Sequence, residues 1–351
     1  MDNALISKGK NMSDFRVGIV GCGRISVMHL VSLANIDGVK LVACCDIKKD
    51  RADSVAEKYG VKAYYSYEQM IEEQNLDAIH ICLPHYLHCK VACYAFSKGI
   101  NVITEKPMDV DFESAKAAVD MAKAKGVLFG VISQCRYNNS ARLVKNAVTS
   151  GKLGKIIAAV STLTWSRSDD YYMESDWKGT WDKEGGGVII DQAIHSLDLA
   201  NWFINDEPIE VQAHLSNRGH SIMEVDDTGE GFIRYKNGAT LSFWAMNNYG
   251  CDDAIEIRLF CENGKVTMSY DDVLIAFNDG TNLTTCTQND GIYYENGKDY
   301  WGFQHIRQIA DFYRAVEEDR QPQISGEEAL KIQRLICDIY EQGRRNFEKR
   351  H

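Results

Sequence analysis

The chain has 351 residues, of which 45% are hydrophobic and 25% are charged, and its formal net charge is -11. This profile indicates a soluble globular protein of about two domains. The acidic balance argues against a nucleic-acid partner, because phosphate binding needs clustered basic side chains and the Lys/Arg groups here are pairs such as Lys48-Lys49 and Arg344-Arg345.

The N-terminal residues contain no apolar signal region, and the chain has no apolar run near the length of about 18 residues that a membrane span needs. We therefore expect a cytoplasmic protein with no membrane contact. The eleven cysteines are odd in number and lie in apolar segments such as LVACCD, which favours reduced thiols over disulfides. The residues up to Met12 are expected to form a loose extension outside the fold.

Residues 14–135 alternate strand-like apolar runs with helix-like amphipathic segments. The expected strands are FRVGIVG, VKLVACCD, VKAYY, DAIHICLP, NVITE and VLFGVIS. Helical segments of about ten residues or more connect most of them, and this alternation predicts a doubly wound parallel sheet covered on both faces. The first domain is therefore expected to span residues 14–135.

Residues 136–351 show a different pattern of apolar and polar residues. After a helix at SARLVKNAVTSGKLG, most segments alternate apolar and polar residues, and Lys-Asn-Gly and Glu-Asn-Gly turns separate two pairs of them. Asn-Gly between alternating runs is a strong hairpin signal. We predict a second α/β domain with a large open, mostly antiparallel sheet, closed by a helix at 326–349 that is a candidate to pack back on the first domain.

The segment VGIVGCGRIS places Gly21 and Gly23 at the end of the first expected strand. Such a turn brings a pyrophosphate onto a helix N-terminus, and Ser26 is small enough for the third position of the fingerprint. We predict a dinucleotide-binding (Rossmann) domain that contacts its cofactor through Gly21, Gly23, Arg24, Ile25 and Asp46. The alternative is a glycine turn that binds another ligand.

Asp46 ends the second expected strand, at the spacing of the acid that binds the ribose. A carboxylate would repel a 2'-phosphate, so NAD is favoured over NADP, although Lys48 and Lys49 reduce this preference. At the carboxyl edge of the fourth strand, LPHYLH places Leu83, Pro84 and His88 beside the cofactor. A zinc site built from His85, His88, Cys89 and Cys93 is the alternative there, but its spacing fits no structural zinc pattern, and we expect no metal.

The segment NVITEKPM ends the fifth expected strand with Glu105, Lys106 and Pro107. Proline restricts the backbone of the preceding lysine, and the glutamate can orient or neutralise its ammonium. A lysine held in this way suits proton transfer or polarisation of a carbonyl. The alternative is an ordinary surface Glu-Lys pair.

The segment GGGVIIDQAIHSLD places Gly185–Gly187 before an apolar helix that carries Asp191 and His195. Residues four apart lie one helical turn apart, so the carboxylate can orient the imidazole while the other ring nitrogen faces a substrate hydroxyl. The glycines are expected to let the backbone pass close to the nicotinamide. Asp198 is expected to be structural, and the alternative for the whole segment is a buried helix with one hydrogen-bonded histidine.

The motifs GIVGCGRIS, EKP and GGG with the following Asp and His resemble, in this order and over essentially the whole chain from about residue 15, the Gfo/Idh/MocA family of oxidoreductases. The resemblance implies a Rossmann domain followed by an α/β domain with a large open sheet, and NAD(P)-dependent action on sugars, inositols and related polyols. It also implies that Lys106 is the family's EKP lysine and that Asp191 and His195 are its catalytic pair. The chain departs from the commonest pattern at Ala193, where many members have glycine, and at His85, where many have asparagine.

Together these features predict a dehydrogenase that oxidises a ring secondary hydroxyl of a sugar, a glycoside or an inositol to a ketone, with C3 of a glycoside as a candidate position. His195, oriented by Asp191, would take the hydroxyl proton while Lys106 hydrogen-bonds the same oxygen. The acidic, aromatic stretch before the glycines suits carbohydrate rings, although it could equally serve packing. Beyond the catalytic residues, the expected substrate contacts are Arg136, Tyr137, Trp165 and Trp177, and Asn138, Tyr171, Tyr172 and Trp181 lie in the same stretches.

Two other functions fit the same motifs. The chain could bind the dinucleotide as a sensor or regulator of sugar metabolism without turnover, or it could act on a non-sugar substrate such as an imine or a tetrapyrrole. Lys106, Asp191 and His195 favour an enzyme over a sensor.

One helix layer would cover only one face of the second sheet, so a homo-oligomer formed through that sheet is expected.

Overall fold

The structure is a computed structural model, and it describes residues 15–285 and 304–349. The expected N-terminal extension lies outside the described residues. Among the described residues the chain forms two compact units. Unit 1 comprises residues 15–109, 113–134 and 304–330, and unit 2 comprises residues 110–112, 135–285 and 331–349. Unit 1 thus includes residues 304–330 from the C-terminal part of the chain, whereas the expected division placed all residues after 135 in the second domain.

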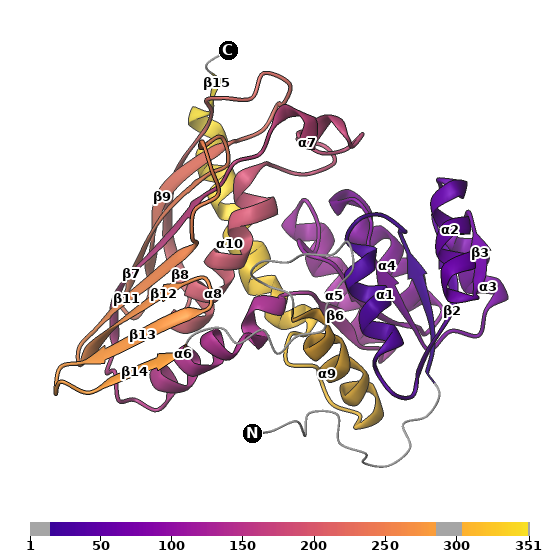
Figure 1. The fold of residues 1–351 in the computed structure, drawn as a ribbon, viewed down its shortest axis with the longest axis horizontal. Helices are drawn as coiled ribbons and strands as arrows, with labels where there is room; N and C mark the ends of the chain where they lie inside the picture. The colour runs from indigo at the N-terminus through magenta and orange to yellow at the C-terminus, as the bar shows by residue number, and fades with distance from the viewer. Residues whose placement is uncertain (1–14, 286–303, 350–351) are drawn as a thin grey trace. The chain divides into compact units, whose positions relative to one another are not determined.

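Unit 1 is built on a six-stranded parallel sheet with the order β3-β2-β1-β4-β5-β6 (Figure 1). The strands are β1 (Phe15–Val20), β2 (Val39–Cys45), β3 (Lys62–Tyr64), β4 (Ala78–Ile81), β5 (Asn101–Thr104) and β6 (Phe129–Val131). The order reverses between β1 and β4, and in doubly wound sheets ligands bind at the carboxyl ends of the strands beside such a reversal. The predicted Rossmann sheet is confirmed.

Six of the following helical segments connect these strands, and α9 comes from the C-terminal part of the chain. The segments are α1 (Ser26–Ala34), α2 (Lys49–Tyr59), α3 (Tyr67–Glu73), the 3-10 turn η1 (His85–Leu87), α4 (His88–Ser97), α5 (Phe112–Lys125) and α9 (His305–Glu317). The last of these was not predicted. Phe312 and Tyr313 of α9 are buried in one core cluster with Phe15, Val17 and Ile103 of the sheet, so α9 completes the core of unit 1 beside α1.

Unit 2 contains a nine-stranded sheet with the order β14-β13-β12-β11-β7-β10-β9-β8-β15. Its strands are β7 (Ile156–Thr164), β8 (Pro208–Asn217), β9 (Thr228–Tyr235), β10 (Thr240–Met246), β11 (Glu256–Cys261), β12 (Gly264–Ser269), β13 (Asp272–Phe277), β14 (Asn282–Thr285) and β15 (Glu348–Lys349). Both hairpins predicted from Asn-Gly turns are present, as β9-β10 and β11-β12. Only the β10-β7 and β15-β8 pairs are parallel, which confirms the mostly antiparallel sheet.

The helical segments of this part of the chain are η2 (Gln134–Tyr137), α6 (Asn139–Thr149), α7 (Asp169–Met173), the π-helix η3 (Ile189–Ala193), α8 (Ile194–Ile204), α10 (Gly326–Gly343) and η4 (Arg344–Asn346). The last helix was expected to reach residue 349. It ends at Gly343, and the chain continues through η4 into the short strand β15 on β8. A Cβ at Gly343 would lie 2.3 Å from the side chain of Leu215 in β8, so the chain passes too close to the sheet there for a larger residue.

Helices α6 and α8 pack against one face of the second sheet (Figure 1). On this face the alternate residues Phe243, Leu259 and Val273 are buried. Neighbouring positions in the same strands point to the opposite face, because side chains alternate along a strand. There Trp244, Phe260 and Leu274 are 39%, 37% and 44% exposed. This face therefore presents large apolar side chains to its surroundings.

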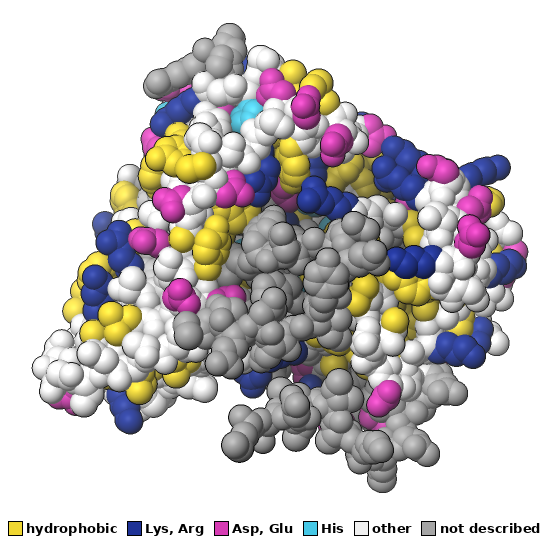
Figure 2. Space-filling view, viewed as in Figure 1, with side chains coloured by type: hydrophobic (Ala, Val, Ile, Leu, Met, Phe, Trp, Pro, Cys, Tyr) yellow, Lys and Arg dark blue, Asp and Glu magenta, His cyan; other side chains and the backbone are white. Residues whose placement is uncertain are grey.

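Lys/Arg and Asp/Glu side chains are interspersed on the visible face of the molecule (Figure 2). Over residues 15–285 and 304–349, no helix combines the length and apolar character needed to cross a membrane. The ten cysteines within these ranges are free thiols, most of them buried.

Candidate active site

The turn after β1 has the backbone geometry of a phosphate-binding loop. Gly21 has φ +97° and donates its N–H to the Cys45 carbonyl at 2.8 Å. A Cβ at Gly21 would lie 2.3 Å from the Cys82 carbonyl oxygen, so no other residue fits. The N–H groups of the next residues, Gly23 to Ile25, donate no hydrogen bond within the described part of the chain. Adjacent open amides before a helix form a cradle for an anionic pyrophosphate.

Asp46 lies beside this cradle and is 9% exposed. One carboxylate oxygen accepts the Cys22 N–H and the other accepts the Lys48 N–H, both at 2.8 Å. These bonds tie the end of β2 to the glycine turn. The carboxylate that is expected to bind the ribose is thereby fixed in orientation, whereas the next side chain, Ile47, is 83% exposed.

The predicted cofactor residues after β4 divide into two kinds. Leu83 and Pro84 are partly exposed, whereas His88 is completely buried. The His88 ring nitrogens lie 2.7 Å from the Pro107 carbonyl oxygen and 2.7 Å from the Leu83 carbonyl oxygen. Burial lowers the pKa of His88, although both carbonyls favour its protonated form. His88 thus ties the loop after β4 to the loop after β5.

Glu105 lies at the centre of a buried polar network. Its Oε1 is 3.0 Å from His29 Nε2 and 2.9 Å from His305 Nε2, and its Oε2 accepts the backbone N–H of Lys106 at 3.2 Å. Burial opposes ionisation, but the two histidines hold the pKa of this carboxyl well below its ordinary value. Glu105 therefore fixes the main chain of Lys106, whose side chain is partly exposed.

The same network extends away from Lys106. His29 Nδ1 lies 2.7 Å from His80 Nδ1, and His80 Nε2 lies 2.7 Å from the Tyr313 hydroxyl. In the described ranges, His29, Glu105 and His305 are the group whose ligand atoms lie close enough, within 4.8 Å, to share a metal ion. Hydrogen bonds to Glu105 account for their close approach. The residues of the rejected zinc alternative have other contacts, since Cys89 donates to the Met108 carbonyl.

In unit 2, the three glycines are required by packing. Gly185 has φ +86°, and a Cβ there would lie 2.9 Å from Val110. A Cβ at Gly186 would lie 2.1 Å from the Tyr340 ring, and one at Gly187 would lie 1.9 Å from the Asp226 carbonyl oxygen. The chain therefore passes too close to its own neighbours for any side chain. This reason differs from the expected approach to the nicotinamide.

The segment after the glycines is fixed by Asp226 and Tyr340. Asp226 accepts the N–H of Gly187 at 2.8 Å and that of Ile189 at 3.1 Å, and the Tyr340 hydroxyl accepts from Gly187 and Ile190. The segment then begins as a π-helix, not as the expected α-helix. A π-turn changes the spacing of side chains and is frequent at functional sites. Asp191 lies in this π-turn, and His195 lies in the first turn of α8.

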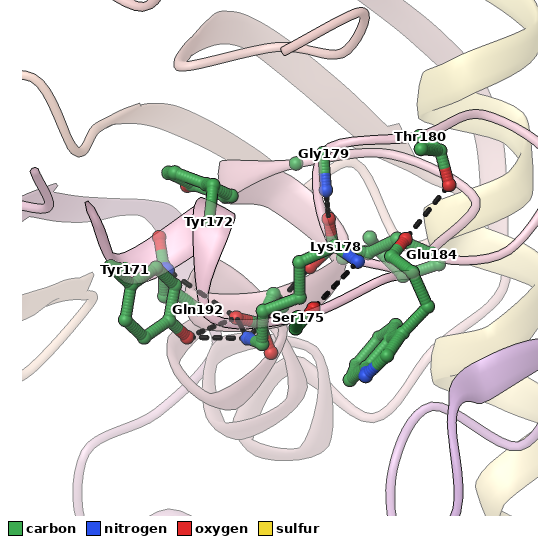
Figure 3. A network of polar contacts seen from close by, with 12 residues as sticks. Tyr171, Tyr172, Ser175, Lys178, Gly179, Thr180, Glu184 and Gln192 are labelled. Atoms are coloured by element: carbon green, nitrogen blue, oxygen red, sulfur yellow. Dashed lines mark hydrogen bonds and ion pairs between the residues drawn. The ribbon is translucent and has the colours of Figure 1, made fainter. Parts of the chain in front are cut away.

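The carboxylate of Asp191 is the centre of a second polar cluster, and its partners Tyr171, Lys178 and Gln192 are labelled in Figure 3. Its Oδ2 accepts from Lys178 Nζ at 2.9 Å, from the Tyr171 hydroxyl at 3.0 Å and from the Gln192 amide at 3.4 Å. Lys178 also donates to the Tyr171 hydroxyl. Burial opposes the charge of Lys178, but the Asp191 carboxylate keeps its pKa well above the ordinary value. The Asp191 carboxyl group is therefore held in place by three donors.

A second carboxyl group lies beyond Lys178. Glu184 is completely buried, lies 3.9 Å from Lys178 Nζ and accepts the Gly179 N–H. Burial raises the pKa of Glu184 to about 8, since the Lys178 ammonium opposes this effect only in part and Asp191 adds to it. On the other side of Asp191, Gln192 accepts from Asn247, which also donates to Tyr172.

The remaining predicted substrate residues lie at different depths. Arg136 is buried and forms two hydrogen bonds with Asp198, at 2.8 and 2.5 Å, and its guanidinium lies 5.3 Å from the Trp202 ring. Tyr137 and Trp165 are also buried, and Trp165 packs under the Arg167 guanidinium at 4.7 Å. Trp177 is half-buried, with Lys178 Nζ 5.2 Å from its ring. Trp177 thus contacts Lys178 of the Asp191 cluster.

Several residues that build these polar networks were missed by the sequence analysis. They are His29, His305, Lys178, Glu184, Asp226 and Tyr340. The segment WKGTW offered one usable signal, because Lys178 stands between two tryptophans that were already considered for substrate binding. Apart from the Lys178–Glu184 pair, which lies within one loop, the other contacts join residues far apart in sequence and leave no local pattern.

Comparison with known proteins assigns both halves of the chain. Residues 15–133 match the model of an oxidoreductase family with an NAD-binding Rossmann fold, and residues 141–267 match the GFO/IDH/MocA C-terminal domain. The chain is 26% identical over 339 residues to myo-inositol 2-dehydrogenase of Thermotoga maritima, a match that covers 89% of this chain and 91% of that protein. It is 25% identical over 350 residues to D-glucoside 3-dehydrogenase of Escherichia coli, covering 94% and 95%.

Solved structures agree with these matches. The WlbA dehydrogenase from Bordetella pertussis, in complex with NADH and UDP-GlcNAcA, superposes with a TM-score of 0.82 and 27% sequence identity. The match covers 94% of this chain and 97% of that one. The similarity therefore extends over both units.

The raised pKa of Glu184 predicts a dependence of stability on pH. Its neutral form is favoured in the folded state, so the folded state loses stability as pH rises from the ordinary glutamate value through about 8. Glu184→Gln stays neutral and should lack this loss. The free energy of unfolding of the variant, relative to that of the unsubstituted chain, should therefore be higher at about pH 9 than at about pH 5, by a few kcal/mol. Thermal unfolding across this range measures the difference.

Glu174→Gln is the control for this prediction, because Glu174 is exposed at the end of α7. Its stability difference from the unsubstituted chain should be the same at every pH. A Glu184→Gln difference that is equally independent of pH would show that Glu184 is ionised in the folded state and would contradict the prediction.

Proposed function

This chain belongs to the GFO/IDH/MocA family of NAD-binding oxidoreductases, and we propose that it oxidises a ring secondary hydroxyl of a sugar, a glycoside or an inositol to a ketone. The observation that carries the proposal is the Asp191 carboxyl group, held by three donors four residues before His195. Relatives named for dehydrogenation of inositols and glucosides support this substrate class.

The residues of unit 1 fit the cofactor NAD. The open amides from Gly23 to Ile25 suit its pyrophosphate, and the fixed carboxylate of Asp46 suits the hydroxyls of its adenosine ribose. Leu83 and Pro84, with Glu105 and Lys106 at the end of β5, would border its nicotinamide end, and His88 would hold their loops. When bound, NAD supplies the acceptor for the hydride that leaves the substrate carbon.

In the proposed reaction, His195 accepts the proton of the substrate hydroxyl as general base. Asp191 orients the imidazole and stabilises its charge after proton transfer. Lys106 donates a hydrogen bond to the same substrate oxygen and withdraws charge from it as the carbonyl forms. Reduction of a ketone uses these groups in the opposite direction, with His195 as the acid.

The substrate would be held mainly by residues of the aromatic stretch. Trp177 offers a half-buried ring beside Lys178, and aromatic faces suit the C–H faces of sugar rings. Trp165, Arg136 and Tyr137 are buried, so we assign them the support of that surface and of nearby polar groups. C3 of a glycoside is the position that we favour, in line with the glucoside dehydrogenase relative.

The first prediction of this proposal concerns turnover. A panel of methyl glucosides, free sugars and inositols with NAD should show NADH formation with at least one compound. Lys106→Ala and His195→Ala should each lower kcat about 100- to 10,000-fold, because each removes a group that assists proton transfer or stabilises developing charge. Titration with NADH should show nearly unchanged cofactor binding.

Lys98→Ala and His214→Ala are suitable controls, since Lys98 is exposed and His214 lies half-buried in β8. Both should retain activity. Unchanged rates in Lys106→Ala and His195→Ala, or no turnover of any compound by the unsubstituted chain, would refute the proposal.

The second prediction concerns the choice of cofactor. Asp46→Ala removes the carboxylate that would repel a 2'-phosphate, so the ratio of kcat/KM for NADP to that for NAD should rise by about 10-fold or more. Asp50→Ala, which removes an exposed carboxylate from the first turn of α2, should leave this ratio unchanged. Equal losses with both cofactors in Asp46→Ala would assign Asp46 to loop structure alone.

The third prediction concerns assembly, for which we propose the apolar sheet face with Trp244, Phe260 and Leu274 as the contact between copies. Light scattering should give at least the mass of a dimer. Charged residues at Trp244 and Leu274 should lower this mass, whereas Ile47→Glu, a change at an exposed position of unit 1, should not. A monomeric unsubstituted chain would contradict this proposal.

A further inference from the structure

Lys178 has more hydrogen-bonding capacity than its neighbours use. Its ammonium carries three N–H bonds, and it donates to Asp191 and to Tyr171. Glu184 lies 3.9 Å away, beyond hydrogen-bond distance. Within the described residues, one N–H bond of Lys178 therefore makes no hydrogen bond, and 16% of its side chain is exposed.

Holding Asp191 in place does not account for this lysine. Asp191 Oδ2 already accepts from the Tyr171 hydroxyl and from Gln192, and both donors are neutral. A buried ammonium carries a large desolvation cost, and an ion pair in such a place is often no more stabilising than neutral groups. A positive charge at this point is therefore better explained by a ligand that it contacts.

The surroundings of Lys178 indicate what that ligand is. Its ammonium and the Asp191 carboxylate lie 2.9 Å apart, and their side chains are 16% and 12% exposed. An ammonium only donates hydrogen bonds and a carboxylate only accepts them. Two oxygens on neighbouring ring carbons can meet this site side by side, with one hydroxyl donating to His195, which Asp191 is proposed to orient, and the adjacent oxygen accepting from the ammonium.

Aromatic rings flank the same ammonium. Lys178 Nζ lies 4.3 Å from the centre of the Tyr171 ring and 5.2 Å from that of the Trp177 ring. Tyr171 and Lys178 point toward one another near the start of the helix that follows the glycines (Figure 3). Aromatic faces beside a donor-acceptor pair suit an uncharged polyol ring, which packs its C–H face on them.

We propose that Lys178 is a substrate-binding residue that donates a hydrogen bond to the oxygen on the ring carbon next to the one that is oxidised. The inference rests on the proposed function. It narrows the substrate class to rings with oxygens on adjacent carbons, and it makes Lys178 a specificity-determining residue. The enzyme should discriminate strongly against a ring that lacks this neighbouring oxygen, because the ammonium would then lose its partner.

The test is a cycle that removes the lysine, the substrate oxygen, or both. Methyl α-D-glucopyranoside is compared with its 2-deoxy and 4-deoxy analogues, and myo-inositol with a monodeoxy inositol, using the unsubstituted enzyme and Lys178→Met. For the parent ring, Lys178→Met should raise KM about 10- to 100-fold, the effect of losing a hydrogen bond to a charged group. For the analogue without the contacted oxygen, it should raise KM less than about 3-fold.

A second readout does not depend on turnover. Calorimetry of the enzyme–NADH complex with the same rings should show the same pattern of lost affinity. Lys183→Met is the matched control, because Lys183 lies in the same loop and its ammonium donates to the Asp176 carbonyl. This variant should bind and oxidise every ring as the unsubstituted enzyme does.

Thermal unfolding and NADH binding establish that each variant is folded, with Lys178→Gln as the second choice if Lys178→Met is not. Equal losses for the parent and every deoxy ring, with turnover retained, would assign Lys178 to positioning and overturn this inference alone. Failure of both variants to fold would also overturn it. No binding and no turnover of any ring by the unsubstituted enzyme would overturn the proposed function together with it.

Discussion

One buried carboxylate, that of Asp226, holds the segment from which the proposed catalytic pair is presented. It accepts the N–H groups of Gly187 and Ile189. Asp226 lies just before β9, which is an inner strand of the second sheet. Burial raises the pKa of Asp226 to about 6, against the opposing effect of these amides. The start of a helix is a favourable place for a negative charge, which offsets part of the cost of burial. Because the glycine backbone is packed against Asp226, the main chain that leads to Asp191 is fixed from the sheet, while Tyr171 and Lys178 hold its carboxyl group.

The same arrangement recurs in unit 1. Glu105 is buried, accepts from His29 and His305, and binds the backbone N–H of the residue that follows it. In each unit a buried carboxyl group accepts several donors and fixes the main chain near a residue proposed to contact the substrate, which is Lys106 in unit 1 and His195 in unit 2. Such support fixes the geometry of reacting groups before the substrate arrives, which is the main requirement for electrostatic catalysis.

Much of this fold follows from local patterns. The alternation of strands and helices predicted the six-stranded parallel sheet, and two Asn-Gly turns predicted two hairpins. Helix α9 was missed although HIRQIADFYRAVE carries apolar residues at helical spacing, and its buried face packs on the core of the first sheet. The π-turn at Asp191 was missed because it is imposed by Asp226 and Tyr340, which are distant in sequence. Lys178 stood in the predicted aromatic stretch, but only the folded chain brings its ammonium to Asp191.

The pairing of Lys178 with Asp191 also bears on the proposed base. A carboxylate beside a histidine favours the protonated imidazole, and an isolated carboxylate would do so strongly. The Lys178 ammonium lies 2.9 Å from Asp191 and partly neutralises the carboxylate charge, so Asp191 stabilises the protonated imidazole less. A general base must take up a proton during the reaction and release it afterwards. A carboxylate whose charge is partly neutralised therefore suits His195 better than an isolated carboxylate, which would stabilise the protonated imidazole too strongly. Lys178 would then affect the reaction twice, through the substrate oxygen that it binds and through the charge that it leaves for His195.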